Sequence, residues 1–211
     1  MKINAITLLR GNLVLANQVG RNVPDGINRH VMVAPTGFDW VGAIAGPAFQ
    51  TSAKPGTLEH SQAKCDFIAG LYNEHLRDLT EDADAVLIWE DDIKPPGDGL
   101  SKLATALSNL GNNVGAVVSA YPQYGDPERA CLWGRPYDES MAMTDLPEFP
   151  FEVFRGGTGF ALFDARALRS ALPLTRDREG VDWCLPLARK LADLGWKTYC
   201  HGAVRCAHLD T

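Results

Sequence analysis

Apolar and polar positions follow the pattern of an α/β protein. Ile3–Leu9 predicts a first strand, and the continuous apolar runs Ala85–Trp89 and Val114–Ala120 predict strands buried on both faces, as in a parallel sheet. Over Ser61–Leu79, apolar side chains recur at spacings of three and four, which predicts an amphipathic helix. The first part of the chain therefore reads as strand, helix, strand.

The rest of the chain continues this alternation. Further strands are predicted at His30–Ala34, Phe151–Phe154, Gly159–Phe163 and Trp196–Cys200, and further helices at Gly99–Leu110, Asp164–Leu172 and Trp183–Leu194. Residues 13–22 fit either a short helix or a loop, the twenty or so residues after Gly37 read as a loop, and 121–150 read as an inserted loop or hairpin region. Alternating strands and helices predict an α/β/α sandwich around a mainly parallel mixed sheet, in a single domain.

Charge and cysteine content narrow the function classes. The 211 residues include 20 basic and 26 acidic side chains, a net charge of −6, which argues against broad attraction to nucleic acid or anionic lipid but leaves a local basic patch open. There is no export signal and no run long enough to span a membrane, so we expect no integral membrane association. Five scattered cysteines then favour reduced thiols in a cytoplasmic protein.

The most informative segment is the acidic triplet Glu90-Asp91-Asp92, which follows the apolar strand and precedes Pro95-Pro96. If the chain stays extended, Glu90 and Asp92 point to one side and Asp91 to the other. Carboxylates at the C-terminal edge of a parallel sheet lie where open α/β folds bind ligands, and their repulsion is relieved by a hard divalent cation. The alternative is an exposed acidic turn that closes a strand.

This segment resembles the D-x-D region of GT-A-fold glycosyltransferases, particularly family-2-like enzymes, with Glu90 in the first acidic place and Asp92 in the last. The resemblance implies that Glu90 and Asp92 hold Mn²⁺ or Mg²⁺ and that Asp91 belongs to the donor site. It also implies a nucleotide diphosphate sugar as the donor, with a UDP-sugar expected. Glu in the first place departs from the usual motif.

A glycine-rich stretch follows in the order that the family shows. Arg155-Gly156-Gly157-Thr158-Gly159 resembles its acceptor-side segment, so these five residues, together with Trp183, are expected to bind the acceptor. Glycines there would allow a close approach of the backbone to a ligand or unusual φ values. The alternative is a β-bulge or a tight turn.

The stretch Glu179-Gly180-Val181-Asp182-Trp183 resembles the family's motif that supplies the catalytic base. Transfer with inversion needs a carboxylate to take the proton of the acceptor hydroxyl, and Asp182 is the candidate, with Glu179 in reserve. Asp182 could equally be the N-cap of the helix that follows, and one residue can do both.

Near the end of the chain, His208 matches a histidine that completes the metal site or contacts the diphosphate in many family members. Its alternative is a solvent-exposed histidine, and the other four histidines are expected to be ordinary surface or core residues. In the weakly matching first sixty residues, Thr7, Arg10 and Asp39 are expected donor contacts. Lys64 on the first long helix could reach the donor or be a solvated lysine.

The sequence thus predicts a metal-dependent, inverting glycosyltransferase whose donor half spans residues 1–95 and whose acceptor half spans 96–211. The hydroxyl acceptor is left open among polysaccharides, small molecules and hydroxylated DNA bases, and the oligomeric state is also open. DNA is kept because arginines concentrate in the second half: Arg129, Arg135, Arg155, Arg166, Arg169, Arg176 and Arg178. The alternatives are a sugar-phosphate nucleotidyltransferase, whose glycine-rich basic signature is missing from residues 1–30, and a non-catalytic nucleotide-sugar-binding module.

Overall fold

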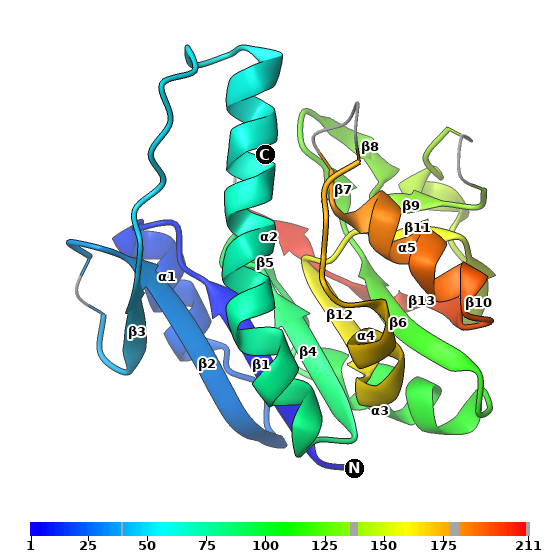
Figure 1. The fold of residues 1–211 in the computed structure, drawn as a ribbon. Coiled ribbons are helices and arrows are strands. Elements are labelled where there is room, and N and C mark those ends of the chain that lie inside the picture. The colour runs from blue at the N-terminus through cyan, green and yellow to red at the C-terminus, as the bar shows by residue number, and fades with distance from the viewer. Residues whose placement is uncertain (39, 136–138, 178–181, 210–211) are drawn as a thin grey trace.

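A computed structural model describes residues 1–38, 40–135, 139–177 and 182–209. Its centre is an eight-stranded sheet in the order β10-β13-β6-β12-β4-β1-β2-β3 (Figure 1). These strands are β1 (Ile3–Leu8), β2 (Ile27–Pro35), β3 (Ala43–Gly46), β4 (Ala85–Trp89), β6 (Val114–Ala120), β10 (Pro150–Val153), β12 (Phe160–Asp164) and β13 (Lys197–Arg205). Four of the seven strand pairings are parallel, and β12, which pairs antiparallel with both β4 and β6, lies between the two parallel groups. The predicted mainly parallel mixed sheet is confirmed.

Helices cover both faces of this sheet (Figure 1). They are α1 (Leu13–Arg21), α2 (Leu58–Glu81), α3 (Gly99–Asn109), α4 (Ala165–Ala171) and α5 (Cys184–Asp193). The helices α2, α4 and α5 pack into one apolar core, and α1 and α3 pack into a second core on the other side. This is the predicted α/β/α sandwich.

Strand β4 shows why a continuous apolar run indicates a central strand. Val86 and Ile88 point into the core beneath α2, whereas Leu87 and Trp89 point into the core beneath α1 and α3. Side chains alternate between the two faces of a strand, so a strand covered on both faces needs apolar residues at every position. The end of this strand is therefore fixed rigidly by packing on both sides.

Several segments differ from the prediction. Residues 13–21 form the helix α1, with Asn12 as its N-cap, and the expected loop after Gly37 contains the edge strand β3. Strand β13 runs on to Arg205, well past the predicted end. Short two-stranded pairs complete the chain: β5 (Ile93–Lys94), β7 (Pro122–Gln123), β8 (Asp126–Ala130), β9 (Leu132–Trp133), β11 (Arg155–Gly156) and β14 (Ala207–His208), with a 3₁₀ turn at Met143–Asp145.

The topology decides which residues can meet. Because β12 is antiparallel to both β4 and β6, those two strands point the same way and their C-terminal ends share one edge of the sheet. Residues that follow β1, β4 and β6 therefore gather at that edge, as ligand-binding residues do in open α/β folds. Among the described residues, no helix combines the length and the apolar character needed to cross a membrane.

Candidate active site

The acidic triplet forms a tight turn at the C-terminal end of β4 and does not stay extended. The amide of Ile93 donates to the carbonyl of Glu90 at 3.1 Å, which closes the turn. Gln18 of α1 donates its side-chain amide to the carbonyls of Asp91, at 3.1 Å, and Ile93, at 3.0 Å. The alternative of an exposed acidic turn is wrong for Asp91 and Asp92, which are 0% and 1% exposed.

Two buried carboxylates need positive partners, and Arg10 is one of them. Its Nε lies 3.3 Å from Asp91 Oδ1 and its Nη2 lies 2.6 Å from Asp92 Oδ2. The backbone amide of Arg10 also donates to Asp91 Oδ2 at 2.7 Å, so Asp91 anchors the loop that follows β1. Gly11, with φ of +78°, allows the chain to turn immediately after Arg10.

His208 is brought to the same carboxylate from the end of the chain. The short strand β14 pairs antiparallel with β5, and the amide of Leu209 donates to the carbonyl of Asp92 at 2.8 Å. His208 Nε2 then lies 3.0 Å from Asp92 Oδ2, and its Nδ1 lies 3.1 Å from the carbonyl of Pro122. The hydrogen bond with Asp92 raises the pKa of His208. The alternative of a solvent-exposed histidine does not describe this residue, because its side chain is only 11% exposed.

Opposing effects set the charge state of the turn. Burial acts to raise the pKa of Asp92, but the hydrogen bond from His208 and the charge of Arg10 outweigh it and lower that pKa. For Glu90, burial and the nearby charge of Asp92 raise the pKa to about 7. Asp92 is therefore ionised at neutral pH, whereas the pKa of Glu90 lies near neutrality.

Glu90 faces the glycine-rich segment. Its Oε1 accepts a hydrogen bond from Thr158 Oγ1 at 3.2 Å, and its backbone amide donates to the carbonyl of Gly159 at 2.8 Å. Thr158 Oγ1 also lies 3.4 Å from the thiol of Cys184, the first residue of α5. Thr158 thus connects the acidic turn to the start of α5.

The glycines of this segment are needed for internal packing. A Cβ at Gly156 would lie 2.3 Å from Val118, one at Gly157 would lie 2.0 Å from the hydroxyl of Tyr121, and one at Gly159 would lie 2.6 Å from Ile93. None of these glycines has a positive φ. The segment is buried, and core side chains from other parts of the chain occupy the space beside the glycines where we expected a ligand.

Asp182 lies just before α5 and makes two contacts. Its Oδ1 accepts the amide of Cys184 at 2.6 Å, as a helix cap would, although the capping position itself is Trp183. Its Oδ2 forms an ion pair with Nη1 of Arg155. The guanidinium of Arg155 in turn stacks on the ring of Trp133, 3.6 Å from its centroid. The base role of Asp182 stays a prediction.

The remaining candidate residues are spread around this edge. Thr7 is buried and its hydroxyl lies 2.9 Å from His30 Nε2. Lys64 is exposed on α2, and Trp183 is 7% exposed, with its ring packed 5.2 Å from that of Tyr72. Asp39 and Glu179 lie outside the described residues. The structure therefore brings together Arg10, Glu90, Asp91, Asp92 and His208 and links them through Thr158 to Asp182.

Sequence reasoning missed Tyr121, which supports two parts of the site. Its hydroxyl accepts the amide of Gly159 at 3.0 Å, and its ring packs edge-on against His208 with centroids 5.9 Å apart. Tyr121 directly follows β6, as Glu90 follows β4. Its place at the end of a buried strand is the sequence signal that could have found it.

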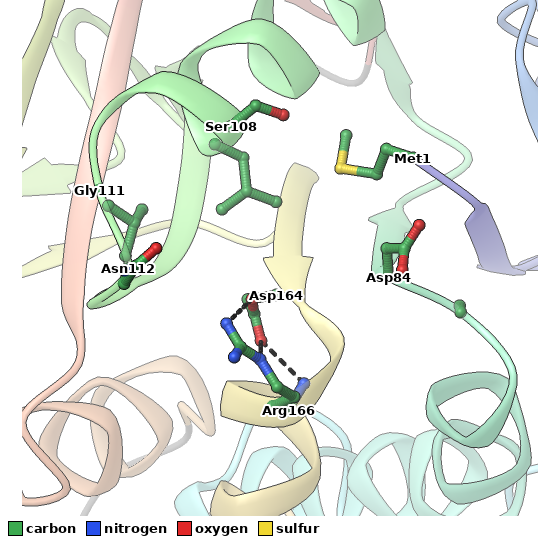
Figure 2. A pocket seen from close by; sticks show the side chains of 10 residues that line it. Met1, Asp84, Ser108, Gly111, Asn112, Asp164 and Arg166 are labelled. Atoms are coloured by element: carbon green, nitrogen blue, oxygen red, sulfur yellow. Dashed lines mark hydrogen bonds and ion pairs between the residues drawn. The ribbon is translucent and has the colours of Figure 1, made fainter.

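A separate hollow of about 550 Å³ lies at the opposite edge of the sheet (Figure 2). It is also acidic, but its carboxylates serve the fold. Asp164 accepts the amides of Arg166 and Ala167 at the start of α4 and pairs with the Arg166 guanidinium at 2.9 Å. Asp84 accepts the amide of Lys2 at 2.6 Å.

The residues of the acidic turn are suited to hold part of a metal's coordination shell. Among the described residues, no group of three or more His, Cys, Asp and Glu side chains could hold a metal by itself. However, Asp92 Oδ1 is buried and accepts no hydrogen bond from the described residues, and His208 stands beside Asp92. The Pro122 carbonyl accepts from Nδ1 of neutral His208, which leaves Nε2 as the ligand atom. Magnesium and its relatives are commonly held by one or two side chains plus phosphate oxygens.

The comparisons with known proteins concern the fold. No family model and no curated protein matches the chain. Among solved structures, A197 from STIV matches with a TM-score of 0.54 and 14% identity, over 99% of this chain and 85% of that one. GalNAc-T7, solved with UDP, GalNAc and Mn²⁺, matches with a TM-score of 0.61 and 9% identity, over 99% of this chain and 44% of that one. The fold is GT-A-like. The chain spans less than half of the GalNAc-T7 chain, and at these identities the likeness concerns architecture alone.

Proposed function

We propose that this GT-A-like protein is a metal-dependent glycosyltransferase that moves a sugar from a nucleotide diphosphate donor, a UDP-sugar, to a hydroxyl acceptor with inversion. The observation that carries the proposal is the convergence of Arg10, Asp92 and His208 at the C-terminal edge of the sheet. Glu90 of the same acidic turn is connected through Thr158 and Cys184 to Asp182. GalNAc-T7, which has the same architecture, was solved with UDP and Mn²⁺, and this supports the same class of donor and metal here.

In this proposal the acidic edge receives the donor diphosphate. Asp92 and His208 would hold Mn²⁺ or Mg²⁺, with Glu90 as the third predicted ligand. The bound metal supplies positive charge that stabilises the departing diphosphate. Arg10 and Asp91, which bind each other, form part of the donor site in this proposal. The further donor contacts that we propose are Thr7, Asp39 and Lys64.

The reaction itself breaks one bond and forms another at the anomeric carbon. The acceptor hydroxyl attacks that carbon while Asp182 takes its proton, and the bond to the diphosphate oxygen breaks with its electron pair leaving on the diphosphate. Asp182 is 38% exposed, so an acceptor can reach it, and the ion pair with Arg155 orients its carboxylate. Trp183 and the Gly156–Gly159 segment hold Asp182 and Arg155 in place, which is the acceptor-side role that we propose for them.

DNA is not the acceptor that we propose. Of the seven arginines that kept it open, five contact partners within this chain. Arg129 pairs with Glu139, Arg155 with Asp182, Arg166 with Asp164 and Arg176 with Asp66, and Arg169 donates to the carbonyl of Thr80. Side chains engaged in this way do not form a stripe for phosphate contacts. A polysaccharide or small-molecule hydroxyl is the acceptor class that we propose.

The test is direct. Purified protein is incubated with a panel of nucleotide diphosphate sugars, with Mn²⁺ or with a chelator, and release of the nucleoside diphosphate is measured together with product mass. We expect metal-dependent release from a UDP-sugar, accelerated by acceptor hydroxyls. Release of pyrophosphate from a nucleoside triphosphate and a sugar phosphate would instead indicate a nucleotidyltransferase. Tight donor binding with no product would indicate a binding module.

A further inference from the structure

The acidic turn carries more negative charge than a buried site can hold alone. Asp91 and Asp92 are 0% and 1% exposed, and Glu90 stands next to them. A buried carboxylate therefore needs a positively charged partner. Without a metal, the positive charge comes from Arg10 on one side and His208 on the other.

The two aspartates hold Arg10 in different ways. Asp91 binds both the backbone amide and Nε of Arg10, at 2.7 and 3.3 Å, so it anchors the residue as a whole. Asp92 contacts only the tip of the guanidinium, Nη2, at 2.6 Å. Its other oxygen, Oδ1, is buried and receives no hydrogen bond from the described residues. Asp92 is therefore the carboxylate with spare ligand capacity, and Arg10 covers one of its two oxygens.

We infer that Arg10 is an exchangeable counter-ion, which neutralises Asp92 in the metal-free protein and releases it when a divalent metal binds. This inference rests on the proposed metal site. The Arg10 side chain is 48% exposed, so rotation about its outer bonds moves the guanidinium away from Asp92 into solvent. The hydrogen bond from the backbone amide of Arg10 to Asp91 does not depend on that rotation, so the loop stays in place.

Once a metal has replaced it at Asp92, the Arg10 guanidinium can bind the donor diphosphate. A guanidinium released from Asp92 still projects from the loop after β1, at the edge where the donor diphosphate is proposed to lie. Guanidinium groups bind phosphate oxygens well. The metal and the arginine thus compete for Asp92 but cooperate on the diphosphate.

The experiment titrates Mn²⁺ alone, without donor, into wild-type protein, Arg10→Gln, Arg10→Lys and the matched control Arg21→Gln, whose arginine lies in the last turn of α1. Free Mn²⁺ is counted by electron paramagnetic resonance. We expect Arg10→Gln to bind Mn²⁺ about tenfold more tightly than wild type, the size of one lost competing ion pair. Arg10→Lys should lie between them, and Arg21→Gln should match wild type. Equal or weaker binding by Arg10→Gln, or no binding to any variant at millimolar Mn²⁺, overturns the inference.

A second measurement uses wild-type protein, so a loss of stability in Arg10→Gln cannot affect its result. In wild-type protein, the ¹⁵Nε–H resonance of Arg10, assigned by its loss in Arg10→Lys, is followed during addition of Mg²⁺ alone. We expect it to shift along the binding curve, and a resonance unchanged at saturating Mg²⁺ contradicts the exchange. The two proposals fail separately. If Arg10→Gln binds Mn²⁺ more tightly but the wild-type protein transfers no sugar, the exchange is supported and the transferase proposal fails. If the wild-type protein transfers sugar but Arg10→Gln binds Mn²⁺ no more tightly, the transferase is supported and the exchange fails.

Discussion

Two arginine–aspartate pairs at the same edge of the sheet are built in opposite ways. In the first, Asp92 is buried with 1% of its side chain exposed, and Arg10 is 48% exposed. In the second, Arg155 is 11% exposed and stacked on Trp133, whereas Asp182 is 38% exposed. Packing fixes the buried member of each pair, and the exposed member is the one that can leave. The first pair therefore presents a fixed anion whose cation can be exchanged, and the second presents a fixed cation beside an accessible carboxylate.

This difference matches the two roles that sugar transfer requires. A metal needs a rigid carboxylate that is ionised, and the lowered pKa of Asp92 meets that need. A general base needs a carboxylate that an incoming hydroxyl can reach. Hydrogen bonds run from Glu90 through Thr158 and Cys184 to Asp182, so the acidic turn that carries Asp92 is connected to the second pair.

The largest effect is expected at the fixed anion. Asp92→Asn removes the charge and keeps the size, and we expect the turnover of donor to fall about a thousandfold, because several kcal/mol of charge stabilisation are lost. Steady-state release of the nucleoside diphosphate measures it. Asp164→Asn is the matched control at the opposite edge, where asparagine can still cap α4, and it should keep wild-type turnover. An Asp92→Asn enzyme within twofold of wild type would remove Asp92 from the mechanism.

The next effect is expected at the accessible carboxylate. Asp182→Asn keeps an oxygen that can accept the Cys184 amide but cannot take a proton, so it separates a base from a cap. We expect the rate of transfer to fall about a hundredfold or more at an unchanged donor KM. Transfer kinetics and urea unfolding are measured together, with Asp193→Asn in the last turn of α5 as the control. Loss of stability with a normal rate per folded molecule would leave Asp182 as a cap alone.

What the sequence predicts well is local. The run Ala85–Trp89 is apolar at every position and is followed by three acids, so both the central strand and the acidic turn could be predicted from neighbouring residues. The edge strand β3 was missed because Ala-Ile-Ala-Gly is short, small and half exposed, with no alternation to read. Helix α1 was ambiguous because its apolar stripe is only three buried residues wide.

What the sequence does not predict is pairing over long separations. The proximity of His208 to Asp92, 116 residues apart, depends on β14 returning to β5. The donor contact of Arg10 stays a prediction, but the sequence gives no sign that two buried carboxylates hold this arginine. The glycines at 156, 157 and 159 were expected to admit a ligand, yet Val118, Tyr121 and Ile93 fill the space beside them. No local pattern carries this information.

A smaller effect tests the packing of the glycine-rich segment. Gly157 lies two residues after Arg155, and a Cβ there would meet Tyr121 at 2.0 Å from its hydroxyl and 2.7 Å from its ring. We expect Gly157→Ala to lower the free energy of unfolding by about 3 kcal/mol, because both sides of the contact are buried. Urea denaturation measures it. Gly97→Ala, where a Cβ meets nothing within 4 Å, should change stability little, and equal losses at both positions would refute the packing argument.

The smallest effect concerns His30, which contacts β1 and the end of β4. His30 bonds to Thr7, three residues before Arg10, and stacks 6.0 Å from Trp89, which precedes Glu90. Burial lowers the pKa of His30 from 6.5 to about 4. As pH falls from 6.5 to 4, the unfolded chain takes up a proton that the folded chain refuses, so stability present above pH 6.5 is lost across this window. We expect a loss of about 2 kcal/mol at pH 4, allowing for partial exposure.

Urea unfolding of wild type and His30→Gln across pH 4 to 8 measures this loss, with His75→Gln on α2 as the control. The difference between wild type and His30→Gln should grow by this amount as pH rises, because carboxylate titration is common to both proteins. Parallel curves would mean that His30 takes up its proton as readily in the folded chain as in the unfolded one, and the burial argument would be wrong.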